Sequence, residues 1–532
     1  MRAGVAGSGA SRRLTAFLMS VAIACVPAVA LAQGATGARD PAALARIFDQ
    51  AMARYALPGM AMGVIEDGKV AWVRTGGETV AGSGDPVQPS TLFKIASNSK
   101  AMTASLLARQ VDAGLLAWDD PVVRHLPTFR MHDPWVTREM QVRDLLVHNS
   151  GLPEGAGDLM LWPEPNRFGR DDIIAGLAHL EPERSFRSGY AYDNLMYVVA
   201  GEVAAAVGGA SYETLLRREV FAPLGLDACR VGQWERAAAG SVAQPHMHAD
   251  TGNVAIRTDG DTVPAITSAA AGGIRCNLDD MLAWALNWLD PTPAQREWLS
   301  QAQRDAMWTA HTPLPVSSRN REWDGTHVRA YGYGWRLADV DGEWTVSHTG
   351  TLSGMYSVLM LLPDRKSGFV VMINGEGSTA RTVLTAALLK YFTDPGSGAD
   401  VSAFAERLES ERTAPSASRV PDTTSRRPID ATFLGARLGR YRDPWFGEVS
   451  VCTVGDGVRF RSVMSPLLSG RVMRVGERAL VDWDDDTVDL EAWMDFHDEG
   501  AGTRMTMAKL DPDGDFSSDY EDLDFRRIGD CE

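Results

Sequence analysis

The segment that decides the fold is LFKIASNSKAMTASLLARQ, residues 92–110. Ser97 and Lys100 are spaced i, i+3 in it, so on a helix the two side chains share one face. A helix that begins at Ser97 directs free backbone N–H groups and its positive dipole end toward whatever binds there. A serine hydroxyl becomes a nucleophile when a base accepts its proton, and a partly desolvated lysine can take part in this. By itself, the pattern is more typical of an N-cap serine beside a surface lysine.

Two later motifs change that interpretation. Tyr192-Asp193-Asn194 lies within SFRSGYAYDNLMYVVAGEVAAAVGG, residues 185–209, on the loop that enters a predicted helix. His348-Thr349-Gly350 lies within WTVSHTGTLSGMYSVLMLLPD, residues 344–364, at the edge of a predicted strand.

Ser-x-x-Lys, Tyr-x-Asn and a basic residue followed by Thr-Gly, in this order, resemble the motifs of the penicillin-recognising serine hydrolases. That family includes class C β-lactamases, D-alanyl-D-alanine carboxypeptidases, D-aminopeptidases and related esterases. Further blocks are similar: DLLVHNSGLP (144–153), FAPLGL (221–226) and AAGGIRCNLDDMLAW (270–284). The resemblance covers about residues 40–395. From LGRYRDPWFGEVSV (438–451) onward, the chain resembles a small β-barrel appendage of some of these hydrolases.

The resemblance implies a role for each matching residue. Ser97 would attack a carbonyl and become acylated, while Lys100 and Tyr192 would share the proton transfers. Tyr192 is the expected partner of the leaving group and of the deacylating water. Asn194 would hold the substrate amide or Lys100. The backbone N–H groups of Ser97 and Thr351 would form the oxyanion hole, in which each donor typically contributes about 10²–10³ in rate.

The third motif departs from that of the lactamases and carboxypeptidases, which carry Lys-Thr-Gly. Their lysine helps to hold a substrate carboxylate, whereas this chain has His348 ahead of Thr349 and Gly350. A neutral imidazole is a poorer carboxylate anchor than a permanent ammonium group. We therefore expect His348 and Gly350 to bind substrate in the manner of the D-aminopeptidase and esterase branches.

Hydrophobic periodicity predicts an α+β domain. The pattern indicates a helix over 40–55, a hairpin over 60–74, a helix over 278–289, two strands within 353–374 and a helix over 379–392. Helical patterns dominate the middle of this region. The terminal strands would then form one antiparallel sheet, flanked by helices as in the β-lactamase and transpeptidase fold.

Composition divides the chain into four parts. We expect a signal peptide over 1–32, the serine hydrolase domain over 33–395, a linker over 396–428 and an all-β domain over 429–532. The linker contains TAPSASRVPDTTSRRP, which lacks hydrophobic periodicity. The last part alternates short strands with Gly/Asp turns, which is typical of a small antiparallel barrel or sandwich.

The N-terminus is typical of an export signal. Arg12 and Arg13 precede an apolar run from Leu14 to Leu31, and Ala30-Leu31-Ala32 fits the small-residue cleavage pattern. The alternatives are a retained membrane anchor and a lipid-attachment cut before Cys25. Cleavage would leave no membrane span and a periplasmic or secreted protein.

Charge and motifs limit the partners. The chain of 532 residues carries a formal net charge of −17, which argues against a general nucleic-acid binder. No nucleotide-binding loop is present, and His246-x-His248 has no accompanying ligand pattern, so we expect neither cofactor nor metal. The Asp511–Asp515 turn hints at a calcium loop, but its glycine is misplaced and its flanks read as strands. The expected partner is a small-molecule or short-peptide substrate, and the oligomeric state stays open.

Four cysteines follow the signal. Closing a barrel would bring Cys452 and Cys531 together, while Cys229 with Cys276 is the weaker expectation and four buried free thiols are the alternative. Since every predicted catalytic residue lies before residue 395, reducing a Cys452–Cys531 bond should loosen the C-terminal domain and leave acylation largely intact.

The sequence thus predicts an exported serine hydrolase that cleaves a small amide or ester, including a D-amino-acid peptide, through an acyl-enzyme. A β-lactamase or carboxypeptidase is the alternative within the enzyme class. A catalytically silent binding protein on the same fold is the alternative outside it.

Overall fold

The computed structural model describes residues 38–398, 400–413, 420–488, 490–499 and 502–531. The predicted export signal lies outside the described residues. Within them, no single helix has the length and hydropathy to cross a bilayer, and only the bent pair Leu195–Gly208 and Tyr212–Leu224 meets that criterion jointly, at 76°.

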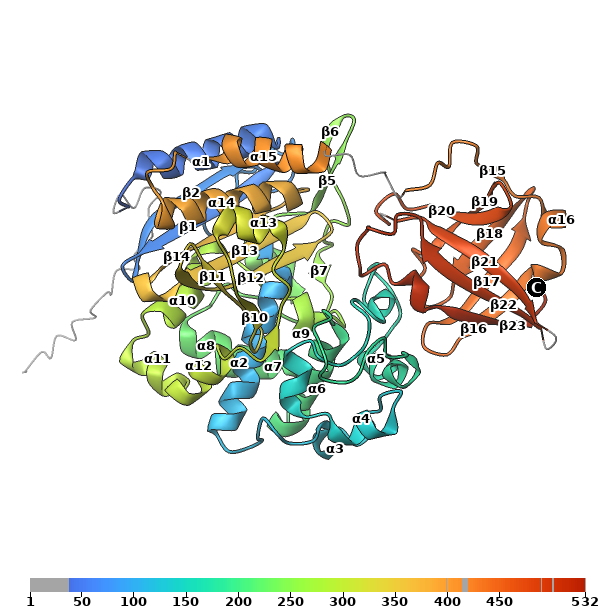
Figure 1. Ribbon diagram of the computed structural model, residues 1–532, viewed down its shortest axis with the longest axis horizontal. Helices are drawn as coiled ribbons and strands as arrows, with labels where there is room; N and C mark the ends of the chain where they lie inside the picture. Colours follow the sequence, from blue (N-terminus) through green and yellow to red (C-terminus); the bar gives the residue numbers. More distant parts are fainter. Residues whose placement is uncertain (1–37, 399, 414–419, 489, 500–501, 532) are drawn as a thin grey trace, which may run out of the picture. The chain divides into compact units, whose positions relative to one another are not determined.

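An eight-stranded antiparallel sheet organises the first domain (Figure 1). Strands from both ends of the domain meet in it, because β1 pairs with β14. The predicted single sheet is therefore confirmed. In spatial order the strands are β2 (Lys69–Gly77), β1 (Gly59–Glu66), β14 (Ser367–Ile373), β13 (Met355–Leu362), β12 (Glu343–Leu352), β11 (Arg336–Val340), β10 (Arg329–Tyr331) and β9 (Thr312–Pro313).

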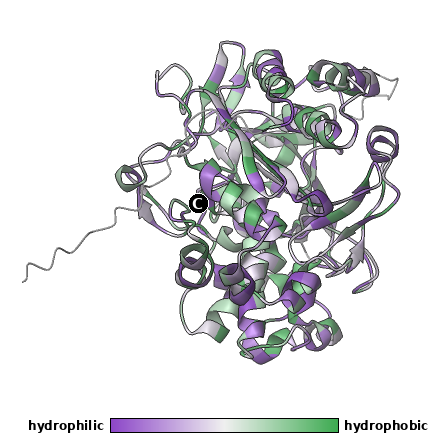
Figure 2. Cartoon of the chain, turned by 90° about the vertical axis from the view of Figure 1, so that its left-hand side faces the viewer, coloured by the Kyte–Doolittle hydropathy of each residue, from purple (hydrophilic) through white to green (hydrophobic). Residues whose placement is uncertain are grey.

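Three helices cover one face of this sheet and lie side by side in Figure 1: α1 (Pro41–Arg54), α14 (Ser378–Thr393) and α15 (Val401–Thr413). The α1 helix starts where the sequence predicts, because the Asp40 carboxylate accepts the backbone N–H of Ala43 at 2.9 Å. Its apolar stripe faces a cluster that includes Phe369 and Val371 of β14. Figure 2 shows hydrophilic and hydrophobic residues mixed along the helices, as expected where one side packs and the other meets water.

Part of the predicted linker forms a helix. Residues 401–413 form α15, whose Val401, Phe404 and Leu408 pack into the cluster beneath α1 and α14. The prediction of a linker over 396–428 is therefore wrong for this stretch, because the i, i+3, i+7 spacing of these side chains gives the helix an apolar face to bury.

The other face of the sheet carries α10 and a helical region. The α10 helix spans Leu278–Leu289, as predicted, and begins at Asn277, whose side chain accepts the N–H of Asp280 at 2.8 Å. It lies so close to β1 that a Cβ on Gly63 would approach Leu282 to 2.7 Å. This face thus joins the sheet to the helices that carry the predicted motifs.

The remaining elements of the first domain are short or belong to the helical region. The helices are α2 (Ser99–Asp112), α3 (Val122–His125), α4 (Pro134–Glu139), α5 (Arg170–Gly176), α6 (Leu195–Gly208), α7 (Tyr212–Leu216), α8 (Ala222–Leu224), α9 (Ala269–Gly272), α11 (Pro293–Trp298), α12 (Gln301–Met307) and α13 (Ser318–Asp324). The two-stranded ladders pair β3 (Phe93–Lys94) with β8 (Arg275–Cys276), β4 (Trp234–Glu235) with β7 (Thr262–Val263), and β5 (His246–Ala249) with β6 (Gly252–Ala255).

The C-terminal domain is a closed barrel, so the sandwich alternative is wrong. Each of eight successive strands pairs with the next, and β16 also pairs with β23, which closes the ring. The strands are β16 (Gly439–Asp443), β17 (Gly447–Val454), β18 (Gly457–Ser462), β19 (Ser469–Val475), β20 (Arg478–Trp483), β21 (Ala492–Glu499), β22 (Gly502–Lys509) and β23 (Asp524–Gly529). Outside the ring, β15 (Arg427–Pro428) pairs with β19, and α16 (Ala431–Leu434) follows it.

Both pairs of cysteines form disulfides. Cys452 bonds to Cys531, which joins the second barrel strand to the chain end as predicted. Cys229 bonds to Cys276 in the first domain, so the alternative of four free thiols is wrong.

Candidate active site

Ser97 and Lys100 lie together at the entrance to α2, as their spacing predicts. Lys100 Nζ lies 3.1 Å from Ser97 Oγ. Ser97 belongs to a short 3₁₀ turn, Ala96–Asn98, and α2 starts at Ser99 rather than at Ser97. Ala96 has a φ of +48°, a left-handed conformation that is costly for a non-glycine residue. The surrounding packing thus holds the nucleophile's turn in a strained geometry.

Lys100 is fully buried, and besides Ser97 its ammonium nitrogen has two hydrogen-bond acceptors. Nζ donates to Asn194 Oδ1 at 2.7 Å and to the Ala271 carbonyl at 2.8 Å. Burial lowers the pKa of Lys100 well below its usual value. A neutral amine has two N–H bonds and one lone pair. Because the two acceptors take both N–H bonds, the lone pair points at Ser97 Oγ, which is the orientation a general base needs.

Tyr192 completes the contact with the nucleophile. Its hydroxyl donates to Ser97 Oγ at 2.8 Å. Burial raises the pKa of Tyr192 far above that of free tyrosine, so the phenol stays protonated. The phenol of Tyr192 therefore carries its proton in the contact with Ser97, whereas the lowered pKa of Lys100 favours an amine that can accept a proton.

Asn194 is held by a carboxyl group that sequence reasoning missed. Asn194 Nδ2 donates to Asp158 Oδ2 at 2.8 Å, which fixes the amide so that its oxygen faces Lys100. Asp158 is fully buried, and desolvation raises its pKa well above the usual value. The signal for Asp158 was weak, since the residue lies outside every motif and 36 positions from Asn194.

The HNSG turn positions the Tyr192–Asn194 triplet. His148 Nδ1 accepts the backbone N–H of Asp193 at 3.0 Å, and Ser150 Oγ donates to the Asp193 carboxylate at 3.0 Å. Burial lowers the pKa of His148 well below its usual value, so the ring is neutral. The contact with the Asp193 backbone gives His148 a turn-stabilising role.

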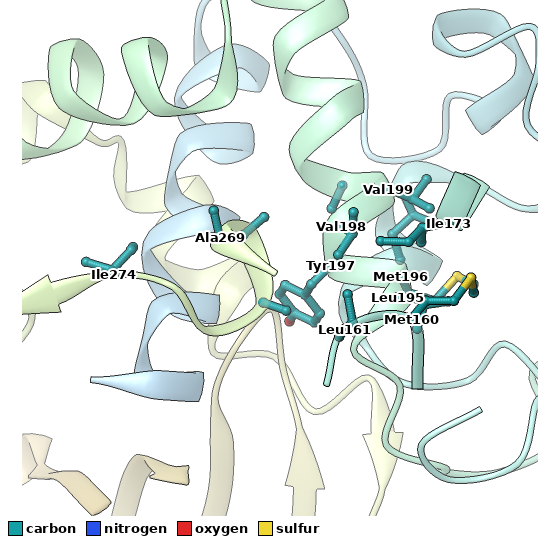
Figure 3. Packing of buried hydrophobic residues seen from close by; sticks show 14 of the residues in the cluster. Met160, Leu161, Ile173, Leu195, Met196, Tyr197, Val198, Val199, Ala269 and Ile274 are labelled. Carbon is teal, nitrogen blue, oxygen red and sulfur yellow. The ribbon is translucent and has the colours of Figure 1, made fainter. Parts of the chain in front are cut away.

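The α6 helix anchors the triplet from the other side. Figure 3 shows residues 195–199 of this helix packed against Met160, Leu161 and Ile173. The Tyr197 hydroxyl also donates to the Leu146 carbonyl at 2.7 Å. The loop that carries Tyr192 and Asn194 is therefore held rigidly from both ends.

His348 is buried behind the third motif. This side chain is 0% exposed, and its Nε2 pairs with the Tyr331 hydroxyl at 2.8 Å. Its Nδ1 pairs with the Thr349 carbonyl at 2.7 Å. His348 lies behind the cavity wall, on the β12 face opposite to Thr349, and does not line the cavity. Strand alternation turns the His348 side chain inward, so direct contact between this side chain and substrate stays a prediction that the burial does not favour.

Gly350 also has a packing role. A Cβ at this position would lie 2.2 Å from the Ile95 carbonyl oxygen. Only glycine lets β12 approach the turn that carries Ser97 this closely. Gly350 therefore allows close backbone packing against the nucleophile's turn, and its expected contact with substrate stays a prediction.

Thr351 occupies the expected place in the cavity wall. Strand β11 pairs with β12 only as far as Ser347, so beyond it the β12 edge meets the cavity. Leu352 and Met355 face each other on the two sides of the tight turn Ser353-Gly354, and Thr351 faces Tyr356 one position further along the strands. Hydrogen-bond alternation then directs the N–H of Thr351 away from β13. The N–H of Ser97 lies at the start of its turn, and both residues line the cavity, so the predicted oxyanion hole stays a prediction that this arrangement supports.

Arg336 places a permanent positive charge in the cavity wall beside Tyr192. Its guanidinium donates to Thr349 Oγ1 at 2.8 Å and lies 5.7 Å from the centre of the Tyr192 ring. Sequence reasoning missed Arg336, which belongs to no motif and comes from the neighbouring strand β11. A permanent cation of the cavity therefore comes from β11 and not from the third motif.

A cavity of about 560 Å³ opens onto these groups. Ser97, Tyr192, Asn194, Arg336 and Thr351 line it. The volume suits a small molecule or a short peptide. Among the described residues, no cluster of three or more His, Cys, Asp or Glu side chains is arranged to hold a metal ion.

The barrel also contributes to this cavity. Residues 513–518, in the loop between β22 and β23, line it. Ser517 Oγ donates to Asp158 Oδ2 at 2.7 Å, and the Phe516 ring lies 5.7 Å from that of Tyr192. Asp519 accepts the backbone N–H groups of Gly157 and Leu159 at 2.6 and 3.0 Å. The C-terminal domain therefore forms part of the cavity wall, and the expected insensitivity of acylation to reduction of Cys452–Cys531 stays a prediction.

Comparisons with known proteins agree with this geometry. The profile of the beta-lactamase family matches residues 44–391. The chain is 25% identical over 430 residues to the unguisins hydrolase ungD' of Aspergillus campestris, covering 76% of this chain and 77% of that protein. It is 28% identical over 350 residues to penicillin-binding protein 4 of Amycolatopsis lactamdurans, covering 64% of this chain and 86% of that protein.

Solved structures share the fold. The penicillin-binding protein homologue from Pyrococcus abyssi aligns with a TM-score of 0.57 and 19% identity, over 87% of this chain and 97% of its own. A class C beta-lactamase mutant aligns with a TM-score of 0.53 and 17% identity, over 66% of this chain and 96% of its own. Together with the family match over most of the first domain, these findings place the chain in the beta-lactamase family of serine hydrolases.

Proposed function

We propose that the protein hydrolyses a small amide or ester through an acyl-enzyme on Ser97. The observation that carries this proposal is the geometry of Lys100, whose two N–H bonds are taken by Asn194 and Ala271. The lone pair is thereby left for the proton of Ser97. This arrangement has no use in a binding protein that only scaffolds.

The first half-reaction follows from these groups. Lys100 accepts the Ser97 proton as Oγ attacks the carbonyl carbon, and the N–H groups of Ser97 and Thr351 stabilise the oxyanion. When the tetrahedral intermediate collapses, Tyr192 donates its proton to the leaving amine or alcohol, and the proton held by Lys100 restores the phenol. The ester on Ser97 is the acyl-enzyme.

Deacylation reverses these roles with water as the nucleophile. A water that enters the vacated leaving-group side gives its proton toward Tyr192 and Lys100 while its oxygen attacks the ester. Collapse expels Ser97 Oγ, which takes the proton back, and the free acid departs. Atoms and protons balance without a cofactor.

For the substrate, we favour a short peptide, including one that contains a D-amino acid. The family of the chain and the name of its relative, an unguisins hydrolase, support a hydrolytic reaction. Arg336 supports the alternative of a β-lactamase or carboxypeptidase, because a guanidinium in the cavity can hold a substrate carboxylate in bidentate fashion.

For location, we favour export to an oxidising compartment. The bonds Cys229–Cys276 and Cys452–Cys531 support it, since disulfides persist outside the reducing cytosol. Of the partners, we keep the small-molecule or short-peptide substrate and no nucleic acid.

Active-site labelling tests the proposal. Purified protein is treated with a fluorophosphonate or a fluorescent penicillin, and the modified peptide is identified by mass spectrometry. We expect the label on Ser97 and none on a folded Ser97→Ala variant. A panel of p-nitrophenyl esters, D- and L-amino-acid anilides and a chromogenic cephalosporin then ranks the substrates. No label on folded wild-type protein would overturn the proposal.

A further inference from the structure

We propose that a second chamber beside the Ser97 cavity binds an anionic group of the substrate through Lys94. The favoured ligand is an apolar acyl chain that ends in a carboxylate. This inference rests on the proposed acyl-enzyme function and adds the substrate class that the chamber selects.

The chamber is continuous with the catalytic cavity. Its volume is about 500 Å³, and Trp162, Gly272 and Leu352 line both spaces. Gly272 lies against the nucleophile's turn, since a Cβ there would be 3.8 Å from the Ser97 backbone nitrogen. A substrate acylated on Ser97 can therefore extend past Gly272 into the chamber.

Lys94 lies in the wall of this chamber with its ammonium group unpaired. None of the described residues offers Nζ a hydrogen bond or an ion pair, although the side chain lines the chamber. On the β3–β8 ladder, Lys94 stands directly opposite Arg275. Like charges directly opposite each other destabilise a sheet. An unpaired ammonium group at this position lowers the stability of the folded protein, which is expected of a residue whose charge serves to bind a ligand.

Two carboxylates, Glu164 and Asp259, line the same chamber, and neither forms an ion pair with Lys94. Asp259 holds Arg275 through two hydrogen bonds of 2.5 and 2.7 Å. Glu164 accepts from Ser268 Oγ at 3.4 Å and lies beyond ion-pair distance from Lys94. Arg257 adds a further positive charge to the surroundings of Lys94. The groups that act on Lys94, together with Lys94 itself, are three cations and two carboxylates, so the site has an excess of positive charge.

Apolar side chains form much of the chamber wall. Phe168, Trp234, Ile256 and Ile266 contribute to it. Apolar walls with one unpaired cation match a hydrocarbon chain that carries a single terminal negative charge. Because Lys94 is three residues before Ser97, their Cα atoms are at most about 10 Å apart, so a chain of moderate length spans the distance.

Protonation supports this assignment. Burial and the charge of Arg275 lower the pKa of Lys94 to about 8. The group therefore stays mainly charged at neutral pH and loses its charge as the pH rises through about 8. An anchoring role predicts that selectivity for anionic substrates declines over the same interval.

The test compares matched p-nitrophenyl esters. One series carries glutaryl, adipoyl and suberoyl groups, each with a free terminal carboxylate, and the other carries the same acyl groups capped as methyl esters. The readout is the ratio of kcat/KM for each acid to that of its neutral partner, measured within one variant. Changes in overall activity then cancel in the ratio.

For the wild type we expect the ratio to exceed one for at least one chain length. In Lys94→Met the ratio should fall about ten- to a hundredfold, the effect of losing a charged hydrogen bond. Lys94→Arg should retain much of it and abolish the decline above pH 8. Lys69→Met, which removes an exposed lysine on β2, is the matched control and should leave the ratio unchanged.

The outcomes separate the two proposals. The anionic subsite would be overturned if wild type hydrolyses the neutral esters with a ratio of one or below. A ratio that Lys94→Met leaves unchanged would overturn it too. Either result leaves the proposed hydrolase function standing. Failure of every ester, with no label on Ser97, would instead overturn the proposed function and the subsite with it.

Discussion

Ser517→Ala tests whether the barrel is part of the catalytic apparatus. Ser517 Oγ donates to Asp158 Oδ2, the same atom that accepts from Asn194 at 2.8 Å. The other oxygen of Asp158 is buried and has no hydrogen-bond partner among the described residues. The variant thus leaves a buried carboxyl with one donor, directly behind the amide that orients Lys100.

The magnitude follows from that single hydrogen bond. Its net contribution is about 0.5–1.5 kcal/mol. If the loss appears in the transition state for acylation, kcat/KM falls about two- to twelvefold. The effect should appear in kcat, because the Asn194–Lys100 alignment matters more during proton transfer than in substrate binding.

The assay is the pre-steady-state burst of a p-nitrophenyl ester, with thermal unfolding followed in parallel. Ser517→Thr keeps a hydroxyl and should restore most of the rate. Ser518→Ala removes a neighbouring hydroxyl that has no hydrogen bond among the described residues, and it serves as the control. Equal burst rates for wild type, Ser517→Ala and Ser518→Ala would show that the barrel loop does not support the site.

Four further variants address the remaining groups. Ser97→Ala should abolish labelling with little change in Tm, and turnover within tenfold of wild type would disprove its role as nucleophile. The kcat/KM of a neutral ester should rise as the pH rises through the lowered pKa of Lys100, because only the neutral amine accepts a proton; a flat profile there, or activity in Lys100→Arg, would contradict this. Arg336→Gln should reduce kcat/KM about tenfold more for substrates with a free carboxylate than for their esters, as a paired kinetic series can show. Replacing Cys452 and Cys531 by serine should cost on the order of 4 kcal/mol of stability in denaturant unfolding and, unlike the expectation from sequence, slow the burst as well.

Local patterns predicted much of the fold. The α10 helix and the caps of α1 and α10 follow from side chains within a few residues of each helix start. The Ser97–Lys100 contact needs only the i, i+3 spacing. Such features are encoded by neighbouring residues, so one sequence suffices to find them.

Contacts between distant segments could not be predicted in the same way. Asp158 and Ser517 are 359 residues apart, and no spacing rule relates them. The orientation of His348 is a different case, because the alternation of side chains along a β-strand can be read from the sequence alone. Residues 349 and 351 share the face that lines the cavity, so His348 had to face away from it.

Two lysines six residues apart show how the surroundings set the chemistry of one side chain. Lys100 is buried beside two fixed acceptors that take its N–H bonds, and its pKa falls well below the usual value, so it serves as a neutral base. Lys94 has no partner among the described residues and keeps a pKa of about 8, so it remains a cation at neutral pH. Both side chains are positioned by the same short run of β3, the 3₁₀ turn and α2. The segment that carries the nucleophile therefore also supplies, on either side of it, a proton acceptor and an anion site. A change that shifts the turn at Ala96 should disturb both at once.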